Sequence, residues 1–199
     1  MYVLRKPDQI HQGDLLEGVE SRFNTLTQDD VTLIDKLTIT LPYAVIMSQD
    51  CDLEQDFQYR NSDDKPNQDK ILQSILVCPA FLAEEVRAGQ HLQSLGLKMQ
   101  IWTKEQWGNI KSNQKERFHY LKESTEHKLE PLVIDFKRYY AIPPDVLYPS
   151  YEKLYKLSID TLYREDLSLR FANYLSRIGL PDQMIPQPID PVTSVVAAS

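Results

Sequence analysis

Apolar residues gather in short runs over the first eighty positions, a pattern typical of strands. The run at 15–19 is predicted to be a short strand entered through a glycine turn, and the runs at 31–34 and 37–41 are strand-like and rich in branched residues. Asp35-Lys36 is predicted to connect the last two tightly. The runs at 43–47 and 71–79 are nearly continuous and have the length of strands covered on both faces. The polar residues from 50 to 70 lack apolar periodicity, which predicts a long surface loop.

Beyond Pro79 the apolar spacing becomes that of helices. Helices are predicted in three segments: 81–86, 102–107 and 110–118. Gly89 ends the first of them, and 132–136 is predicted to be a late strand. After Ile142-Pro143-Pro144-Asp145, apolar residues recur at roughly helical spacing as far as Ile178.

These elements predict an α+β fold: a small curved antiparallel β-sheet or SH3-like barrel, followed by a helical C-terminal half. Residues 1–142 would form the barrel-like domain, with a helical insertion at about 81–125. Residues 143–182 would form a helical subdomain, and 183–199, with three prolines and then small residues, a disordered tail.

Composition narrows the class of protein. The chain has 199 residues, 42% hydrophobic and 26% charged, as in ordinary folded domains. Its formal charge of −7 gives no general attraction to nucleic acid or to anionic membranes. It has neither an apolar run long enough to span a membrane nor an N-terminal signal sequence, and only two cysteines. We therefore expect a cytoplasmic protein without a membrane partner.

Three segments carry a resemblance to a known family: Gly13-Asp14-Leu15, Val45-Ile46-Met47-Ser48 and Ile75-Leu76-Val77-Cys78-Pro79-Ala80. Together they resemble the PemK/MazF-like family of small SH3-like β-barrels, many of which are ribonuclease toxins. That family has an arginine before its second strand, where this chain has Leu41-Pro42-Tyr43. It has a hydroxyl residue after the proline of its third strand, where this chain has Ala80-Phe81. The resemblance thus implies the fold but not the ribonuclease residues.

The strand at 43–47 ends in Ser48-Gln49-Asp50-Cys51-Asp52, which makes this edge the first candidate site. With the distant Cys78-Pro79, it also resembles a group of bacterial proteins associated with mobile elements. The predicted binding residues are Ser48, Gln49, Asp50, Asp52 and Arg117. The alternative is a structural interpretation, in which the carboxylates would cap backbone N–H groups and Cys51 would fill a small apolar gap.

A catalytic hypothesis takes Cys51 as nucleophile, His119 as its base and Asp135 as the group that orients the histidine. The two aspartates that flank Cys51 argue against it, because nearby carboxylates raise the pKa of a thiol.

A metal hypothesis takes Cys51, Cys78 and His119 as zinc ligands, with Asp52 or His127 as the fourth. The chain lacks the closely spaced Cys or His pairs that mark zinc sites. If the strands at 43–47 and 72–78 are antiparallel, the two cysteines lie past opposite ends of the pair, about 20 Å apart. Parallel strands would instead make them neighbours. Asp56, Asp63 or Asp64 could add carboxylates for Mg²⁺ or Ca²⁺.

The last predicted helix has an apolar stripe interleaved with Arg164, Arg170 and Arg177. The stripe consists of Leu162, Phe171, Tyr174, Leu175 and Ile178. It would bind a partner or pack on the sheet. From all of this we predict a non-enzymatic intracellular binding or regulatory module of mobile-element or defence type, which recognises a partner protein or nucleic acid without a cofactor. The alternative is a MazF-like ribonuclease or a Cys/His hydrolase that uses Cys51 and His119.

Overall fold

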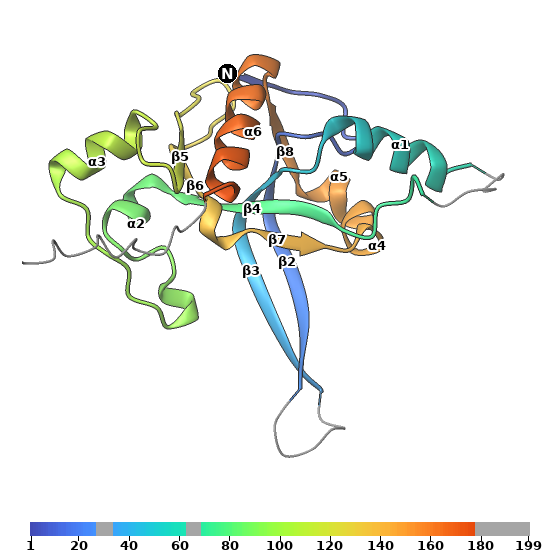
Figure 1. Cartoon of the computed structure of the whole chain (residues 1–199), viewed down its shortest axis with the longest axis horizontal. Helices are drawn as coiled ribbons and strands as arrows, with labels where there is room; N and C mark the ends of the chain where they lie inside the picture. Colours follow the sequence, from blue (N-terminus) through green and yellow to red (C-terminus); the bar gives the residue numbers. More distant parts are fainter. Residues whose placement is uncertain (27–33, 63–68, 178–199) are drawn as a thin grey trace, which may run out of the picture.

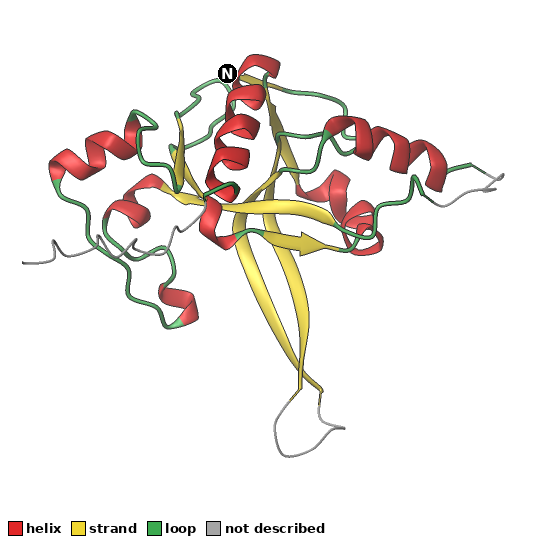
Figure 2. Ribbon diagram, viewed as in Figure 1, coloured by secondary structure: helices red, strands yellow, loops and turns green. Residues whose placement is uncertain are grey.

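The computed structural model of the chain describes residues 1–26, 34–62 and 69–177, and these contain one antiparallel sheet (Figures 1 and 2). The strand order is β1-β8-β2-β3-β4-β6-β5, and β7 also pairs with β4. The strands are β1 (Tyr2–Val3), β2 (Asp14–Leu26), β3 (Ile34–Ile46), β4 (Ile75–Leu82), β5 (Phe118–Leu121), β6 (Leu132–Asp135), β7 (Tyr140–Ile142) and β8 (Tyr155–Ile159). The α+β class is confirmed. The sheet of described strands is open, because β1 and β5 lie at opposite ends of its order.

Helices cover the sheet from several sides. They are α1 (Asp50–Arg60), α2 (Ala83–Arg87), α3 (Lys104–Lys111), α4 (Pro144–Leu147), α5 (Tyr151–Leu154) and α6 (Thr161–Leu175). Three 3₁₀ turns complete the elements: η1 (Gln93–Leu95), η2 (Phe136–Arg138) and η3 (Tyr148–Ser150). Figure 1 shows α6 across one face of the sheet, with α1 at one side of the molecule and α2 and α3 at the other.

Side-chain alternation along the central strands produces the core. Leu15 belongs to a cluster with Phe136 of η2 and Phe171 of α6, whose rings lie 5.4 Å apart. The next residue, Leu16, belongs to a second cluster that includes Leu53 of α1. Successive residues of a strand point to opposite faces, so the middle of the sheet is covered on both. This agrees with the strand covered on both faces that the apolar run at 43–47 predicts.

The hairpin of β2 and β3 projects from the body as a long ribbon (Figure 1). Its register runs from Leu15↔Val45 out to Leu26↔Ile34. The tight connection predicted at Asp35-Lys36 is wrong, because both residues lie within β3. Most of the run predicted at 31–34 lies outside the described residues.

The loop predicted from 50 to 70 is wrong in its first half, which is α1. This helix docks through a polar side chain as well as an apolar one, so its apolar spacing is weak. Asp56 is buried and accepts hydrogen bonds from Arg60 Nε at 2.8 Å and from Tyr148 Oη at 2.8 Å. It also accepts one from the backbone N–H of Leu72 at 2.7 Å, so a single carboxylate joins α1 to two other segments.

The segment at 81–125 contains α2 and α3, which begins at a capping box between Thr103 and Gln106. A continuous helix predicted at 110–118 is wrong, since α3 ends at Lys111 and Phe118 begins β5. The segment at 143–182 contains α4, α5 and α6, and also β8, which pairs with β1 and β2. The predicted tail at 183–199 lies outside the described residues.

Candidate functional site

The predicted site at 48–52 lies where β3 passes into α1, and Asp50 is its inward-facing residue. Asp50 Oδ1 accepts the Gln12 N–H at 3.1 Å and lies 3.1 Å from His11 Nδ1. Its Oδ2 accepts Arg164 Nη1 of α6 at 2.9 Å. Burial raises the pKa of Asp50, but the hydrogen bonds from Gln12 and His11 and the charge of Arg164 outweigh it, so the net pKa is lowered. Asp50 thus joins three separate segments as a carboxylate.

Gly13 allows the loop before β2 to approach the side chain of Arg164 closely. Its φ is +82°, a left-handed conformation that favours glycine, and a Cβ there would lie 3.0 Å from Arg164 Cγ. The Gly13 N–H donates to the Ile46 carbonyl at 2.9 Å, and the Gly13 carbonyl accepts the Ile159 N–H at 2.9 Å. The loop at 11–13 is therefore held between β3 and β8, directly against the arginine stem.

Asp14, next in sequence, is completely buried. Its Oδ1 accepts Ser158 Oγ at 2.6 Å, and its Oδ2 accepts Tyr151 Oη at 2.6 Å and the His11 N–H at 2.6 Å. Burial raises the pKa of Asp14, and the three hydrogen bonds oppose that rise. Both carboxylates of this region thus have hydrogen-bond partners on each oxygen, and their first role is to connect segments.

The other predicted binding residues have different positions. Ser48 Oγ accepts the Leu76 N–H at 2.8 Å and so links β3 to β4. Gln49 stands at the N-cap of α1, where its side chain makes no capping hydrogen bond to the helix, and Asp52 lies exposed in the first turn. Cys51 is exposed too, with Sγ 3.7 Å from side-chain oxygens of Gln49 and Asp52. The idea that Cys51 fills an apolar gap is wrong, because its side chain faces solvent.

The proposed Cys51, His119 and Asp135 set is not brought together. His119 pairs with Ile134 across β5 and β6, whereas Asp135 pairs with Phe118. Residues opposite each other share a face and neighbours along a strand alternate, so His119 and Asp135 point to opposite faces. Burial, together with the charge of Arg170, lowers the pKa of His119 to about 3. Cys51 belongs to α1, which does not flank these strands.

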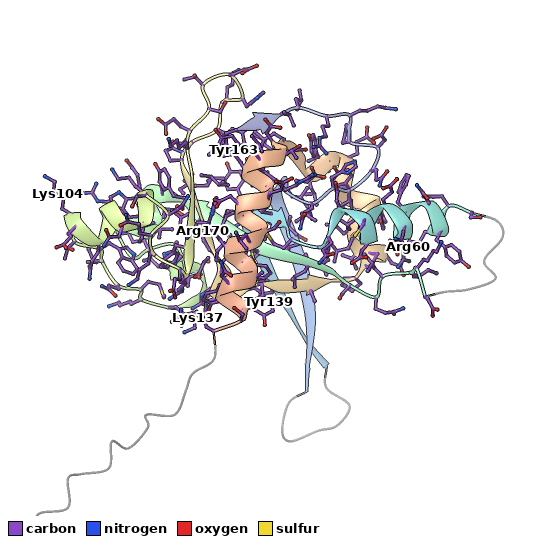
Figure 3. All side chains as sticks on the ribbon, turned by 45° about the horizontal axis from the view of Figure 1, so that its top comes forward. Arg60, Lys104, Lys137, Tyr139, Tyr163 and Arg170 are labelled. Carbon is purple, nitrogen blue, oxygen red and sulfur yellow. The ribbon has the colours of Figure 1, made fainter. Side chains whose placement is uncertain are left out.

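His119 and Asp135 each have an arginine as hydrogen-bond partner. Arg170 of α6 donates to His119 Nδ1 at 3.1 Å, and Figure 3 shows this arginine midway along the helix. Asp135 accepts two hydrogen bonds from Arg117, at 2.7 and 2.6 Å. Arg117, predicted to bind a ligand, therefore pairs within the chain.

The predicted zinc site is not assembled either. β3 and β4 are antiparallel, and Cys78 lies opposite Val45 in the core, where burial and then Asp135 raise the pKa of its thiol. Cys51 is exposed on the far side of the β3–α1 junction. Within the described ranges, no three His, Cys, Asp or Glu side chains are grouped so as to hold a metal. Asp63 and Asp64 lie outside those ranges.

The arginines in and just after α6 bind to the body of the protein. Arg164 pairs with Asp50, Arg170 donates to the Phe118 carbonyl at 2.9 Å as well as to His119, and Arg177 Nε lies 3.2 Å from Glu116. Of the predicted stripe, Phe171 and Tyr174 pack on the core, whereas Leu162 and Leu175 are exposed. Leu167, which was not assigned to the stripe, is buried. The packing interpretation therefore holds for part of the stripe.

The residues that sequence reasoning missed are those around Asp14. Gly13-Asp14 carries only the family resemblance in the sequence, while Tyr151 and Ser158 belong to a segment predicted as helix.

Comparison with known proteins gives no match to a protein-family model, to a curated protein or to a solved structure. No helix in the described part of the chain is both long and apolar enough to cross a membrane.

Proposed function

We propose that this protein is a non-enzymatic intracellular binding module that recognises a partner protein through the ribbon of β2 and β3. The observation that carries the proposal is the pairing of these strands. β2 pairs with β8 only at Asp14–Leu16, and β3 pairs with β4 only at 43–46. From Val19↔Leu41 to Leu26↔Ile34, the described strands pair only with each other.

This two-stranded part has eight residue pairs and a length of about 25 Å at about 3.3 Å per residue. Two strands alone are marginally stable in water, and their outer edges present backbone groups that can pair with another chain. A partner that covers the ribbon would satisfy those groups. The net charge of −7 favours a protein over a nucleic acid as that partner.

We also propose a relationship to PemK/MazF-like proteins, which concerns the fold and not the ribonuclease activity. The three segments that carry the resemblance overlap β2, β3 and β4, which are consecutive neighbours in the sheet. In this view the sheet is an SH3-like arrangement enlarged by β8 and β1 on one side and by β6 and β5 on the other. The two free cysteines suit a reducing compartment.

Site-specific photo-crosslinking in cells tests the proposal. A photoreactive residue replaces Glu20 on the ribbon, and in a matched control it replaces Glu165, an exposed glutamate on α6. We expect a discrete protein adduct at position 20 that is absent at position 165. The same bands from both positions, no adduct at position 20, or an adduct with nucleic acid there would overturn the proposal.

Incubation of the purified protein with RNA tests the enzymatic alternative. Cleavage that disappears in Cys51→Ala would overturn the binding-only function. That substitution changes an exposed side chain, so loss of activity would not reflect loss of fold.

A further inference from the structure

A cavity lies where β3 and β4 separate. The two strands pair from Ile46↔Val77 to Tyr43↔Ala80, after which β4 continues beside β6 while β3 runs out into the ribbon. The space between them, which we name the fork cleft, has a volume of about 400 Å³. Its walls include residues 39–42 of β3, Phe81 of β4, Tyr140 of β7 and residues 90–95. Cavities of this size commonly hold ligands.

His91, in the wall of the fork cleft, has unusual surroundings. Its side chain is only 6% exposed, and neither ring nitrogen has a hydrogen-bond partner among the described residues. The nearby Glu85 carbonyl favours the charged ring but does not reach hydrogen-bond geometry. The ring stands edge-on to Phe81 with centroids 5.0 Å apart. Burial lowers the pKa of His91, so the ring is neutral near pH 7.

A neutral imidazole has one donor and one acceptor nitrogen, and both are unsatisfied here. Leaving a buried polar group unpaired costs about 1–3 kcal/mol, so a water, an ion or a ligand group that pairs with it is stabilising. A hydroxyl or a primary amide can donate and accept at once. Either can therefore pair with one ring nitrogen of His91, as donor or as acceptor, whichever tautomer the ring adopts.

The free edge of β3 limits the form of the occupant. β2 pairs with one edge of residues 39–41, and no described strand pairs with the other, which borders the fork cleft. An added strand would satisfy this edge by backbone hydrogen bonds, the usual mode of β-strand addition. Among the described residues in the wall, Glu85 carries the only charge, and it is negative, which disfavours a phosphate backbone.

We propose that an extended segment of a partner protein adds as a strand to β3 at residues 39–42 and inserts a Ser, Thr, Asn or Gln side chain beside His91. This deepens the binding function proposed above and rests on it. The segment supplies the backbone partners that β3 lacks, and its inserted side chain supplies a hydrogen bond to one ring nitrogen of His91. A neutral polar sequence fits the cleft, and an acidic one is repelled by Glu85.

A displayed library of random peptides of about twelve residues, selected on the full chain, tests the inference. We expect enriched peptides with a Ser, Thr, Asn or Gln at one fixed position, and hydrogen-exchange protection at Ile39–Leu41 when they bind. His91→Phe keeps the ring against Phe81 but removes both nitrogens, and should weaken the selected peptides by about tenfold or more. Lys104→Ala, which changes an exposed residue at the start of α3, should leave their affinity unchanged.

Stability of the free protein gives a second measurement. Because His91 has no hydrogen bond to lose, His91→Phe should unfold at the same or a higher urea concentration than the wild type. A clear destabilisation would overturn the inference, as would the absence of any enriched peptide or equal binding by His91→Phe. The binding module itself would survive these results if Glu20 still gave its crosslink, since Glu20 lies on β2, the other strand of the ribbon.

Discussion

Removing the buried carboxylate of Asp14 should strongly destabilise the fold. In Asp14→Ala, three donors lose their acceptor: the His11 N–H, Tyr151 Oη and Ser158 Oγ. Ser158 Oγ keeps a partner in Tyr155 Oη at 2.9 Å, so two donors are left unpaired. At about 1–3 kcal/mol each, the free energy of unfolding should fall by about 2–6 kcal/mol, a large part of the 5–15 kcal/mol typical of a domain.

Urea denaturation followed by circular dichroism measures this loss as a lower midpoint at unchanged slope. Glu165→Ala, which removes an exposed carboxylate from α6, is the control and should stay within about 0.5 kcal/mol of the wild type. Asp14→Asn should be milder than Asp14→Ala, because the amide oxygen can accept from His11 and Tyr151 while its NH₂ donates to Ser158. A loss below about 1 kcal/mol in Asp14→Ala would refute the reasoning.

The same comparison has a pH dependence. Burial raises the pKa of Asp14, so the folded protein holds this proton at higher pH than the unfolded chain does. The stability from this group is complete below the unfolded pKa of about 3.9 and is lost as pH rises through the folded pKa. The wild type should therefore lose stability relative to Asp14→Asn as pH rises. A relative gain would show that the hydrogen bonds to the carboxylate outweigh its burial.

Two further predictions concern the junction of β3 and α1. The ion pair of Asp50 and Arg164 should give a coupling free energy of about 0.5–2 kcal/mol in a double-mutant cycle of Asp50→Asn and Arg164→Met, and a value near zero would contradict the link between α1 and α6. Exposed Cys51 should react rapidly with a thiol reagent while buried Cys78, whose pKa is raised, reacts only after unfolding. Rapid labelling that persists in Cys51→Ser would contradict this assignment.

Sequence patterns predicted the elements that depend on apolar side chains. The runs at 43–47 and 71–79 predicted the end of β3 and most of β4, because apolar residues fill both faces of these strands there. The helix α1 was missed because Asp56, a buried carboxylate, carries much of its docking. β8 was missed because its flanking helices continue the same apolar spacing, and its partners, β1 and β2, lie more than a hundred residues earlier in the chain.

The candidate site shows a second limit of prediction from sequence, which is the direction in which each side chain points. Sequence placed Asp50 and Cys51 together, but successive residues of a helix point about 100° apart, so one faces the body and the other solvent. The hydrogen-bond partners of Asp50 are residues 11, 12 and 164. No local pattern in the sequence predicts that these residues lie close to Asp50. His119 and Asp135 have suitable chemistry for a catalytic pair, but the register of β5 and β6 places them on opposite faces.

The pairing of β8 with β1 and β2 also affects how the chain folds. Tyr2 pairs with Ile159, and Asp14 with Ser158, so the first strands obtain these neighbours only after almost the whole described chain has been synthesised. Contacts between such distant residues close large loops and slow the search for the native state. During synthesis, the edge of β2 that later receives β8 remains open to wrong pairing. The arrival of β8 therefore both completes the sheet and ends the period in which that edge can aggregate.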